Sequence, residues 1–357
     1  GSEMCIRDRY GKLPATEGKK EIPALGFIAH MDTVSDFCDH EIRPMVTENY
    51  DGGDLVLGTS GLVLSPKEFP HLTGLKGRTL LTSDGTTILG ADDKAGIAEI
   101  LTMIERIQTE NRPHGMICVA FTPDEEIGMG AEHFNLDQFG AEYAYTLDGD
   151  SEGEIQYENF NACKAEFEIR GFNVHPGEGK DTMINASLVA IEINNCLPSM
   201  ETPRGTEDYE GFYHLISMQG EVGEAKLNYI VRDHDKNGFE ERKKTLRLIE
   251  KNLNAKWGEG TVTLKITDQY LNMKEIVEEH MHLIDHAKKA CEAAGVAPLI
   301  LPIRGGTDGC QLSFKGLPCP NLGTGGHAFH GPYEHISVEG MEKSVELLLA
   351  LIQEYTK

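Results

Sequence analysis

The sequence predicts an α/β protein in which a mostly parallel sheet is covered by helices and interrupted by an inserted α+β domain. Three apolar runs typical of buried strands occupy residues 24–30, 116–122 and 143–147. A segment with apolar residues at helical spacing lies between the first two runs, at 95–104. From residue 159 onward the strands instead alternate polar and apolar positions. Strands that alternate with helices favour parallel pairing, and the change of pattern favours a second domain.

The first strand, 24–30, ends at His30. A long segment rich in glycine and containing proline follows, from about 35 to 85. Asp92 or Asp93 is then expected to cap the helix that follows, because aspartate is a preferred N-cap residue.

The second strand, 116–122, is ended by Pro123. The Asp-Glu-Glu sequence after it, which contains Glu125 and Glu126, is expected to begin the next helix. The third strand, 143–147, ends at Asp148. Sites in open parallel sheets form at the carboxyl ends of strands. Each of these three strands ends at, or a few residues before, a candidate site residue.

The inserted domain is expected to hold two helices on a small, mostly antiparallel sheet. Its predicted elements are strands at 161–171, 227–233 and 261–267 and helices at 182–196 and 239–253. The first domain then resumes with one long helix at 274–295, a strand at 298–303 and a final helix. The predicted boundaries are 10–158 and 269–357 for the first domain and 159–268 for the insertion.

Charge and cysteine content exclude several classes of function. The chain has 58 Asp and Glu against 33 Lys and Arg, a formal charge of −25. Nucleic acids and anionic membranes attract basic surfaces, so neither is an expected partner. No apolar run approaches the ~20 residues that span a bilayer. The 8 cysteines form no CxxC pair, which favours a reduced, cytoplasmic location.

Five potential metal ligands are scattered along the chain: His30, Asp92, Glu126, Asp148 and His330. Two imidazoles and three carboxylates suit zinc, cobalt or manganese. Two further acids, Asp32 and Glu125, flank this set. Each piece has an ordinary structural alternative, such as a helix cap or a turn, but their coincidence at strand ends favours one metal site.

Long motifs in this order resemble the co-catalytic zinc exopeptidases, which have a catalytic domain and a lid domain, and within them the tripeptide aminopeptidases. The motifs are ALGFIAHMDTVSDF, TILGADDKAGIAEI, VAFTPDEEIGMGAEHF, AYTLDGDSEGEIQYENFNA, RGFNVHPGEGKDTMINA, IRGGTDGCQLSFKGLPCPNLGTGG and FHGPYEHISVEGMEKSVELL. The resemblance runs from about Ala24 to the C-terminus.

The resemblance implies two zinc ions per chain, with cobalt or manganese as alternatives. Asp92 would bridge the two ions. His30 and Asp148 would complete the site of one ion, and Glu126 and His330 that of the other. A carboxylate suits the bridge because each of its oxygens can serve one cation.

The resemblance also assigns catalytic roles to the two flanking acids. Glu125 would be the general base that takes a proton from the attacking water and passes it to the leaving amine. Asp32 would contact the far nitrogen of His30 and orient the ring. A cis peptide bond is expected between Asp92 and Asp93.

Three residues resemble substrate ligands of the family. His175 in NVHPG would stabilise the oxyanion, and Arg232 and Arg304 would bind the peptide carboxylate, which a guanidinium can contact bidentately. The sequence departs from the family pattern at Asp150, which adds charge near the metals, and at His327, where an aromatic residue is common.

The predicted function is a metal-dependent aminopeptidase that releases the N-terminal residue of tripeptides, so small peptides are the expected substrates. A homodimer that forms through the lid domain is a possible assembly. A dipeptidase, a carboxypeptidase or an amide deacylase would share the metal site. A catalytically silent metal-binding or interaction protein is the alternative from another class. Cleavage of di-, tri- and tetrapeptides with free and blocked ends would separate these functions.

The first nine residues are expected to be a tag or artefact, because Gly1-Ser2 resembles a cleavage scar and MCIRDR a translated adapter. The resemblance further implies an N-terminal helix and strand before the position of Tyr10.

Overall fold

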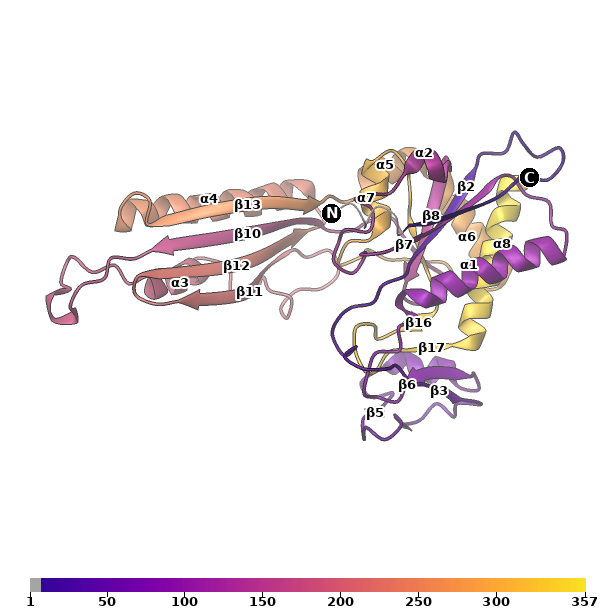
Figure 1. Ribbon diagram of the computed structural model, residues 1–357, viewed down its shortest axis with the longest axis horizontal. Helices are drawn as coiled ribbons and strands as arrows, with labels where there is room; N and C mark the ends of the chain where they lie inside the picture. The colour runs from indigo at the N-terminus through magenta and orange to yellow at the C-terminus, as the bar shows by residue number, and fades with distance from the viewer. Residues whose placement is uncertain (1–7) are drawn as a thin grey trace. The chain divides into compact units, whose positions relative to one another are not determined.

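The computed structural model describes residues 8–357, and the chain divides into two compact units (Figure 1). The first contains the described residues up to Tyr157 together with Met273–Leu301 and Thr307–Lys357. The second contains Glu158–Asn272 and Pro302–Gly306, so residues 269–272 and 302–306 belong to it and not to the resumed first domain. The predicted tag at 1–9 lies mostly outside the described residues.

A seven-stranded sheet forms the centre of the first unit, in the order β1-β7-β2-β8-β15-β9-β14. The strands are β1 (Arg9–Leu13), β2 (Leu25–His30), β7 (Ile117–Thr122), β8 (Tyr143–Gly149), β9 (Glu154–Gln156), β14 (Leu299–Ile300) and β15 (Asn321–Gly323). Strands β7, β2, β8 and β15 run parallel, whereas β1 and β9 pair antiparallel with β7 and β15. The predicted α/β class is confirmed, although β1 was not predicted and β14 is shorter than the expected 298–303.

Helices cover both faces of this sheet, as a largely parallel sheet requires. On one face, α1 (Ala91–Thr109), α6 (His282–Ala294) and α8 (Val338–Thr356) pack together, and α1 contacts β2 and β8 (Figure 1). On the other face, an apolar cluster joins the sheet to α2 (Leu136–Phe139) and α7 (Asp308–Phe314). Every residue of β2 is consequently buried. None of the helices between residues 8 and 357 is long and apolar enough to cross a bilayer.

Helix α1 approaches β8 very closely, and this requires a glycine. A Cβ atom at Gly96 would lie 2.3 Å from the carbonyl oxygen of Leu147. The apolar residues Ile100, Met103 and Ile107 of the same helix face are buried. The start of α1, where Asp92 lies, is thereby fixed against the end of β8, where Asp148 lies.

A smaller sheet of the first unit has the order β16-β17-β6-β3. Its strands are β3 (Pro44–Thr47), β6 (Leu80–Ser83), β16 (Gly326–His327) and β17 (His335–Ser337). Nearby lie a separate hairpin of β4 (Leu55–Val56) and β5 (Val63–Leu64) and the 3-10 helix η2 (Pro70–Leu75). The glycine-rich segment from 35 to 85 is therefore largely ordered. The hairpin of β16 and β17 presents the loop that contains His330.

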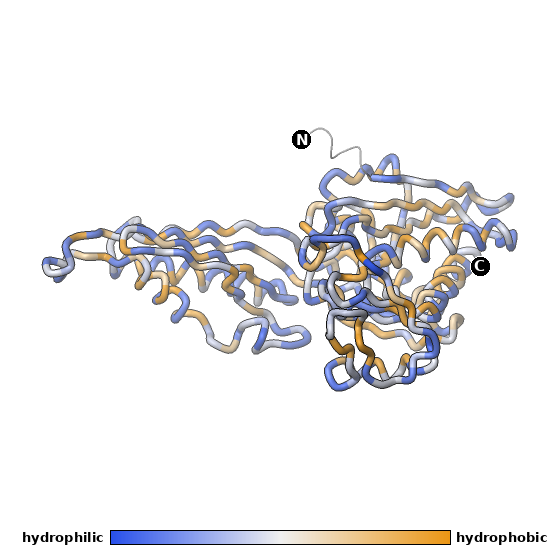
Figure 2. Tube along the Cα trace, turned by 60° about the horizontal axis from the view of Figure 1, so that its bottom comes forward, coloured by the Kyte–Doolittle hydropathy of each residue, from blue (hydrophilic) through white to orange (hydrophobic). Residues whose placement is uncertain are grey.

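The second unit is a four-stranded antiparallel sheet in the order β11-β12-β10-β13, packed against helices. Its elements are β10 (Asn161–Arg170), η3 (Pro176–Glu178), α3 (Ala186–Asn195), β11 (Phe212–Gly220), β12 (Glu224–Asp233), α4 (Lys236–Trp257) and β13 (Val262–Tyr270). Buried and more exposed positions alternate along β10 and β12, and hydrophobic and hydrophilic residues alternate accordingly along the strands (Figure 2). The expected two helices on an antiparallel sheet are present.

The predicted long helix at 274–295 is wrong in its first half. The chain forms α5 (Lys274–Val277), then the 3-10 helix η4 (Glu278–His280), and only then α6. The rings of His280 and His282 both contact Tyr143, with centroids 5.6 and 4.7 Å away. Residues two apart do not share a face of a regular α-helix, so the chain changes its winding here.

The helix expected to begin at the Asp-Glu-Glu sequence is also absent from the structure. Residues 124–133 form successive turns, in which Asp124 and Gly128 have left-handed φ values of 63° and 73°. A left-handed residue does not continue a right-handed helix. Glu125 and Glu126 therefore lie in a tight turn after β7.

Candidate metal centre

All five predicted metal ligands belong to the first unit and meet at one end of its large sheet. His30 ends β2, Asp148 lies near the end of β8, and Glu126 lies in the turn after β7. These three strands are parallel neighbours, so their carboxyl ends lie side by side. Asp92 comes from the first turn of α1 and His330 from the loop between β16 and β17.

Asp92 lies between the two histidines. Its Oδ1 atom is 2.7 Å from Nε2 of His30, and its Oδ2 atom is 3.0 Å from Nε2 of His330. Each carboxylate oxygen thus faces a different imidazole, which is the arrangement expected of a carboxylate that bridges two cations. The peptide bond from Asp92 to Asp93 is cis, as predicted.

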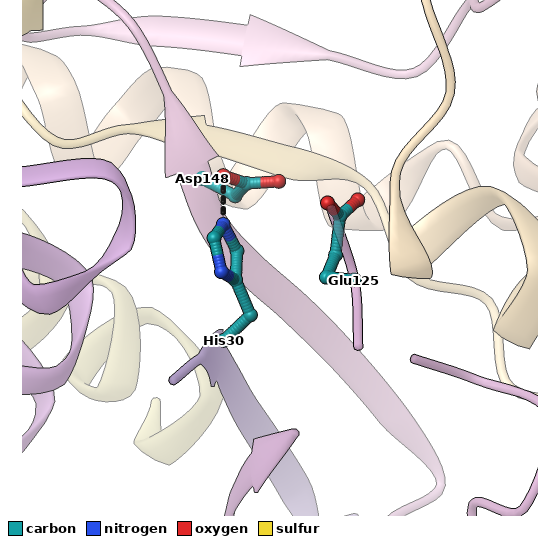
Figure 3. A group of neighbouring side chains, drawn as sticks. All are labelled: His30, Glu125 and Asp148. Atoms are coloured by element: carbon teal, nitrogen blue, oxygen red, sulfur yellow. Dashed lines mark ion pairs between the residues drawn. The ribbon is translucent and has the colours of Figure 1, made fainter. Parts of the chain in front are cut away.

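The other two carboxylates each approach one histidine. Asp148 Oδ1 is 3.4 Å from His30 Nε2, the ion pair drawn in Figure 3, and Glu126 Oε2 is 3.3 Å from His330 Nε2. Two groups of three residues could each hold a metal ion, because in each group one donor atom per residue lies within 4.8 Å of the other two. The two groups share His30. They are His30, Asp92 and Glu126, and His30, Glu125 and Asp148.

Glu125 faces the site, with its carboxylate on the same side as Asp148 (Figure 3). Burial raises the pKa of Glu125 well above its ordinary value, and the negative charges of Asp148 and Asp308 raise it further. Without bound cations, this carboxyl group therefore keeps its proton to a higher pH than an ordinary glutamate does.

Asp32 organises the turn that contains Glu125 and Glu126. Its two carboxylate oxygens accept hydrogen bonds from the backbone N–H groups of these residues, at 3.2 and 3.1 Å. The nearest acceptor to Nδ1 of His30 is the backbone carbonyl of Asp32, at 3.1 Å, while the Asp32 carboxylate is 3.5 Å away. Asp32 thus contacts both the histidine and the turn.

The carboxylates strongly favour protonated histidines when no cation neutralises them. Burial opposes a charged His30, yet hydrogen bonds with Asp148, Asp32 and Asp92 raise its pKa. The pKa of His330 is raised to about 10 by Asp92 and Glu126. Burial raises the pKa of Asp148 to about 6. A cation bound here would replace these protons, because ligating histidine must be neutral.

Two acids at the site were missed from the sequence. Glu334 is 1% exposed, and its carboxylate accepts hydrogen bonds from the N–H groups of Leu89, Gly90 and Asp92, at 2.6, 2.7 and 3.0 Å. It thereby ties the His330 loop to the start of α1. The only signal in the sequence is its place four residues after His330, which does not indicate this contact.

The second missed acid is Asp308, at the start of α7. It is 3% exposed, accepts a hydrogen bond from Thr122 Oγ1 at 2.7 Å, and has one oxygen without a partner among the described residues. Burial raises its pKa to about 7. A Cβ atom at Gly130 would lie 2.3 Å from this carboxylate, so a glycine is required there.

The three predicted substrate ligands belong to the second unit. His175 is exposed, and its Nδ1 accepts a hydrogen bond from the N–H of Gly177. Arg232 is 9% exposed, donates from one terminal nitrogen to Cys163, Val231 and Gln269, and stacks on Tyr270.

Both terminal nitrogens of Arg304 donate to the loop at 206–210. The acceptors are the carbonyl oxygens of Thr206, Asp208 and Glu210 and the hydroxyl of Thr206. These donors are therefore already occupied within the second unit.

His327, one of the two departures from the family pattern, does not lie with the five predicted metal ligands. Its ring stacks on that of His71 with centroids 4.0 Å apart and lies opposite His335 across the β16–β17 pair. His71 and His335 are joined through their Nε2 atoms at 2.8 Å. Burial lowers the pKa of His327 to about 3 and that of His335 to about 4, so the cluster is neutral at physiological pH.

Comparisons with known proteins agree with this geometry. The sequence profile of the Peptidase family M20/M25/M40 matches residues 85–354. A protein named Peptidase T from Desulfitobacterium hafniense (strain DSM 10664 / DCB-2) is 55% identical over 350 residues, which cover 98% of this chain and 85% of the relative. Peptidase T of Caldanaerobacter subterraneus subsp. tengcongensis is 52% identical over 342 residues, which cover 95% of this chain and 83% of the relative.

Solved structures show the same fold. The aminopeptidase PepT from Bacillus cereus superimposes with a TM-score of 0.78 at 26% identity, covering 98% of this chain and 85% of its own. A tripeptidase from Staphylococcus aureus superimposes with a TM-score of 0.78 at 22% identity, covering 98% of this chain and 84% of its own. This chain therefore belongs to the Peptidase family M20/M25/M40 and is an enzyme that cleaves peptides.

Proposed function

We propose that this enzyme is an aminopeptidase that releases the N-terminal residue of tripeptides at a centre of two divalent cations. The observation that carries the proposal is Asp92, whose two carboxylate oxygens each face one of the histidines His30 and His330. The relatives named Peptidase T, which align over nearly the whole chain, support the peptide substrate.

The donor set fits zinc, with cobalt or manganese as alternatives. Imidazole nitrogens and carboxylate oxygens are ligands that these borderline cations accept, whereas magnesium and calcium favour oxygen ligands alone. His30 and Asp148 would bind one cation, Glu126 and His330 the other, and Asp92 both. When bound, such cations would polarise the scissile carbonyl and lower the pKa of a water molecule.

The chemistry of this chain's own residues then centres on Glu125. Its carboxylate would accept a proton from the attacking water and transfer it to the amine that leaves. Asp32 would keep Glu125 in place, because it accepts hydrogen bonds from the backbone N–H groups of the turn. A single carboxyl group can serve both halves of this transfer, first as the base and then as the acid.

Recognition of the peptide carboxylate is assigned to Arg232. Among residues 8–357, hydrogen bonds of the Arg232 guanidinium involve only Nη1, so Nη2 and Nε are the proposed donors to the ligand. Both terminal nitrogens of Arg304 instead donate to loop oxygens. Arg304 is therefore a weaker candidate for direct contact and is proposed to shape the 206–210 loop. His175 stays a predicted oxyanion ligand, with Nε2 as its donor.

A panel of peptides tests the proposed function. The enzyme loaded with zinc should cleave trialanine much faster than dialanine or tetra-alanine, and it should reject an N-acetylated tripeptide. A tripeptide amide should lose about 30- to 150-fold in kcat/KM, because one charge-assisted hydrogen bond to the terminal carboxylate is lost. Liquid chromatography of the products identifies the bond that is cleaved.

The same panel separates the alternatives. Release of the C-terminal residue would indicate a carboxypeptidase, preference for dipeptides a dipeptidase, and cleavage of acylated amino acids a deacylase. Absence of cleavage with two cations bound would instead support a metal-binding or interaction protein. Equal rates on the tripeptide acid and amide would refute the carboxylate contact.

A homodimer through the second unit is a further part of the proposal. Leu188 and Ile191 of α3 and Ile216 and Met218 of β11 are exposed, and β11 is an edge strand. Exposed apolar side chains beside an unpaired strand edge are typical of an association surface. Light scattering should give the mass of a dimer, and Ile216→Lys should give that of a monomer. The cytoplasm is the proposed location.

A further inference from the structure

Helix α7 and the residue that follows it bind the backbone of the turn after β7. Gln311 Nε2 donates a hydrogen bond to the carbonyl oxygen of Gly128 at 3.1 Å. Lys315, at the end of the helix, donates from Nζ to the carbonyl oxygens of Ala131 and Glu132, the second at 2.9 Å. These carbonyl groups lie 183 or 184 residues earlier in the chain. One short helix therefore fixes three carbonyl groups of the turn.

The start of α7 contacts the same region through Asp308. A Cβ atom at Gly130 would lie 2.3 and 2.5 Å from the two carboxylate oxygens of Asp308, so these groups pack closely. Asp308 also accepts a hydrogen bond from Thr122, the last residue of β7, at 2.7 Å. Helix α7 thus contacts the chain both before and after Glu125.

The turn after β7 does not keep its shape by local preference alone. Asp124 has a left-handed φ of 63°, which is unfavourable for a residue other than glycine. The N–H of Met129 donates to the carbonyl of Asp124 at 2.9 Å. Unfavourable backbone conformations persist where surrounding contacts fix them, and the contacts with α7 are of this kind.

The Gln311 contact reaches Glu125 through a single residue. Gly128 accepts the hydrogen bond from Gln311 at its carbonyl, and its own N–H donates to the carbonyl of Glu125 at 2.6 Å. Asp32 accepts from the N–H of Glu125 at 3.2 Å. The backbone of Glu125 is therefore held at its N–H by Asp32 and at its carbonyl, through Gly128, by Gln311.

Glu125 depends on these backbone contacts more than its neighbour Glu126 does. A carboxylate that ligates a cation is held in place by that cation, whereas the proposed base ligates none. Within residues 8–357 the carboxylate of Glu125, which faces the site in Figure 3, makes no hydrogen bond. Its position is thus set by the backbone of the turn. A displacement of about 1 Å at a reacting group can lower a rate by about 100-fold.

We propose that Gln311 is a positioning residue for the general base Glu125 and that Lys315 assists it. This inference rests on the proposed aminopeptidase activity, in which Glu125 is the base. By fixing the carbonyl of Gly128, Gln311 holds the backbone of Glu125 in the conformation that directs the carboxylate into the metal centre. Loss of the contact slows proton transfer but removes no ligand of a cation.

Gln311→Met tests this role, because methionine keeps the length of the side chain and removes its donor. On trialanine, kcat should fall about 10-fold, while KM stays within about twofold and the protein still binds two zinc ions. Gln138→Met is the matched control, since it makes the same change at an exposed glutamine of α2 and should keep the native kcat. Lys315→Met should show the same pattern as Gln311→Met and replaces it if that variant does not fold.

A double-mutant cycle with Glu125→Gln separates positioning of the base from a general structural role. In the Glu125→Gln background, Gln311→Met should change kcat by about twofold or less, because a positioning residue has no further effect once its target is removed. An equal loss of kcat in both backgrounds would overturn the inference, as would a native kcat in Gln311→Met. Loss of zinc from Gln311→Met would also overturn it, since the contact would then act through Glu126.

Hydrogen exchange of the zinc-loaded protein gives a readout that needs no turnover. The N–H groups of Gly128 and Met129 should exchange about 3- to 10-fold faster in Gln311→Met, the effect of one lost hydrogen bond, while those of β7 keep their native rates. Unchanged exchange in the turn would overturn the inference. Faster exchange confined to the turn, without cleavage of trialanine by the native protein, would overturn the proposed function and leave the contact between Gln311 and the turn.

Discussion

Replacing Glu125 with Gln should lower kcat on a tripeptide by about 100-fold or more while both cations remain bound. Glutamine preserves the size of the side chain but cannot accept the proton of the attacking water. The backbone N–H of residue 125 would still donate to Asp32, so the turn should keep its shape. Single-turnover kinetics together with emission spectrometry would measure the two effects separately.

Glu126→Gln is the matched control for this prediction, because it makes the same chemical change one residue further on. Glu126 Oε2 lies 3.3 Å from His330 and is proposed as a ligand, so this variant should bind one of the two cations more weakly. Excess zinc should then restore part of the activity of Glu126→Gln. It should restore none of the activity of Glu125→Gln. If both variants lost metal and activity alike, the division of roles between the two glutamates would be wrong.

Replacing Asp92 with Ala should have the largest effect on metal content. The native protein, dialysed and reconstituted with zinc, should contain two ions per chain. Asp92 is the only proposed ligand with one oxygen toward each histidine, so its removal weakens both cation positions together. We expect the variant to bind at most one ion per chain. Its loss of activity should be larger than the loss of about 10- to 100-fold that is typical when a residue next to a metal ligand is changed.

Emission spectrometry at several zinc concentrations would measure this loss, and circular dichroism would establish that the fold is retained. Asp51→Ala, at an exposed position of the first unit, is the control and should keep two ions. A native protein that saturates with a single ion, or an Asp92→Ala protein that still binds two, would exclude a bridging role.

The candidate ligands could be predicted because strand ends are visible in a sequence. His30 and Asp148 each follow an apolar run, and parallel neighbouring strands bring such ends together. Their identity as ligands, and the pairing of Asp92 with His330, came from a resemblance and not from spacing. The contacts of Asp92 in the structure agree with that pairing, although His330 is 238 residues away along the chain.

The contacts that support the site could not be predicted in the same way. Glu334 accepts hydrogen bonds from backbone groups about 245 residues earlier, and a backbone N–H leaves no trace in the amino-acid sequence. The turn at 125–126 is a similar case. Its residues favour a helix start by local preference, but Asp32, 93 residues earlier, binds the N–H groups in another geometry. Tertiary contacts override local propensity at such places.

The position of β15 has a consequence for how the enzyme is made in the cell. This strand comes from residues 321–323, yet it lies between β8 and β9, which are adjacent in the chain and end before residue 157. While the ribosome is still translating the intervening segment, the inner edge of β8 has no partner, and unpaired edges are prone to aggregation. The second unit, whose sheet uses only strands up to Tyr270, can complete its own pairing earlier. Completion of the catalytic sheet must therefore await the last tenth of the chain, which makes the nascent protein dependent on protection until translation is nearly finished.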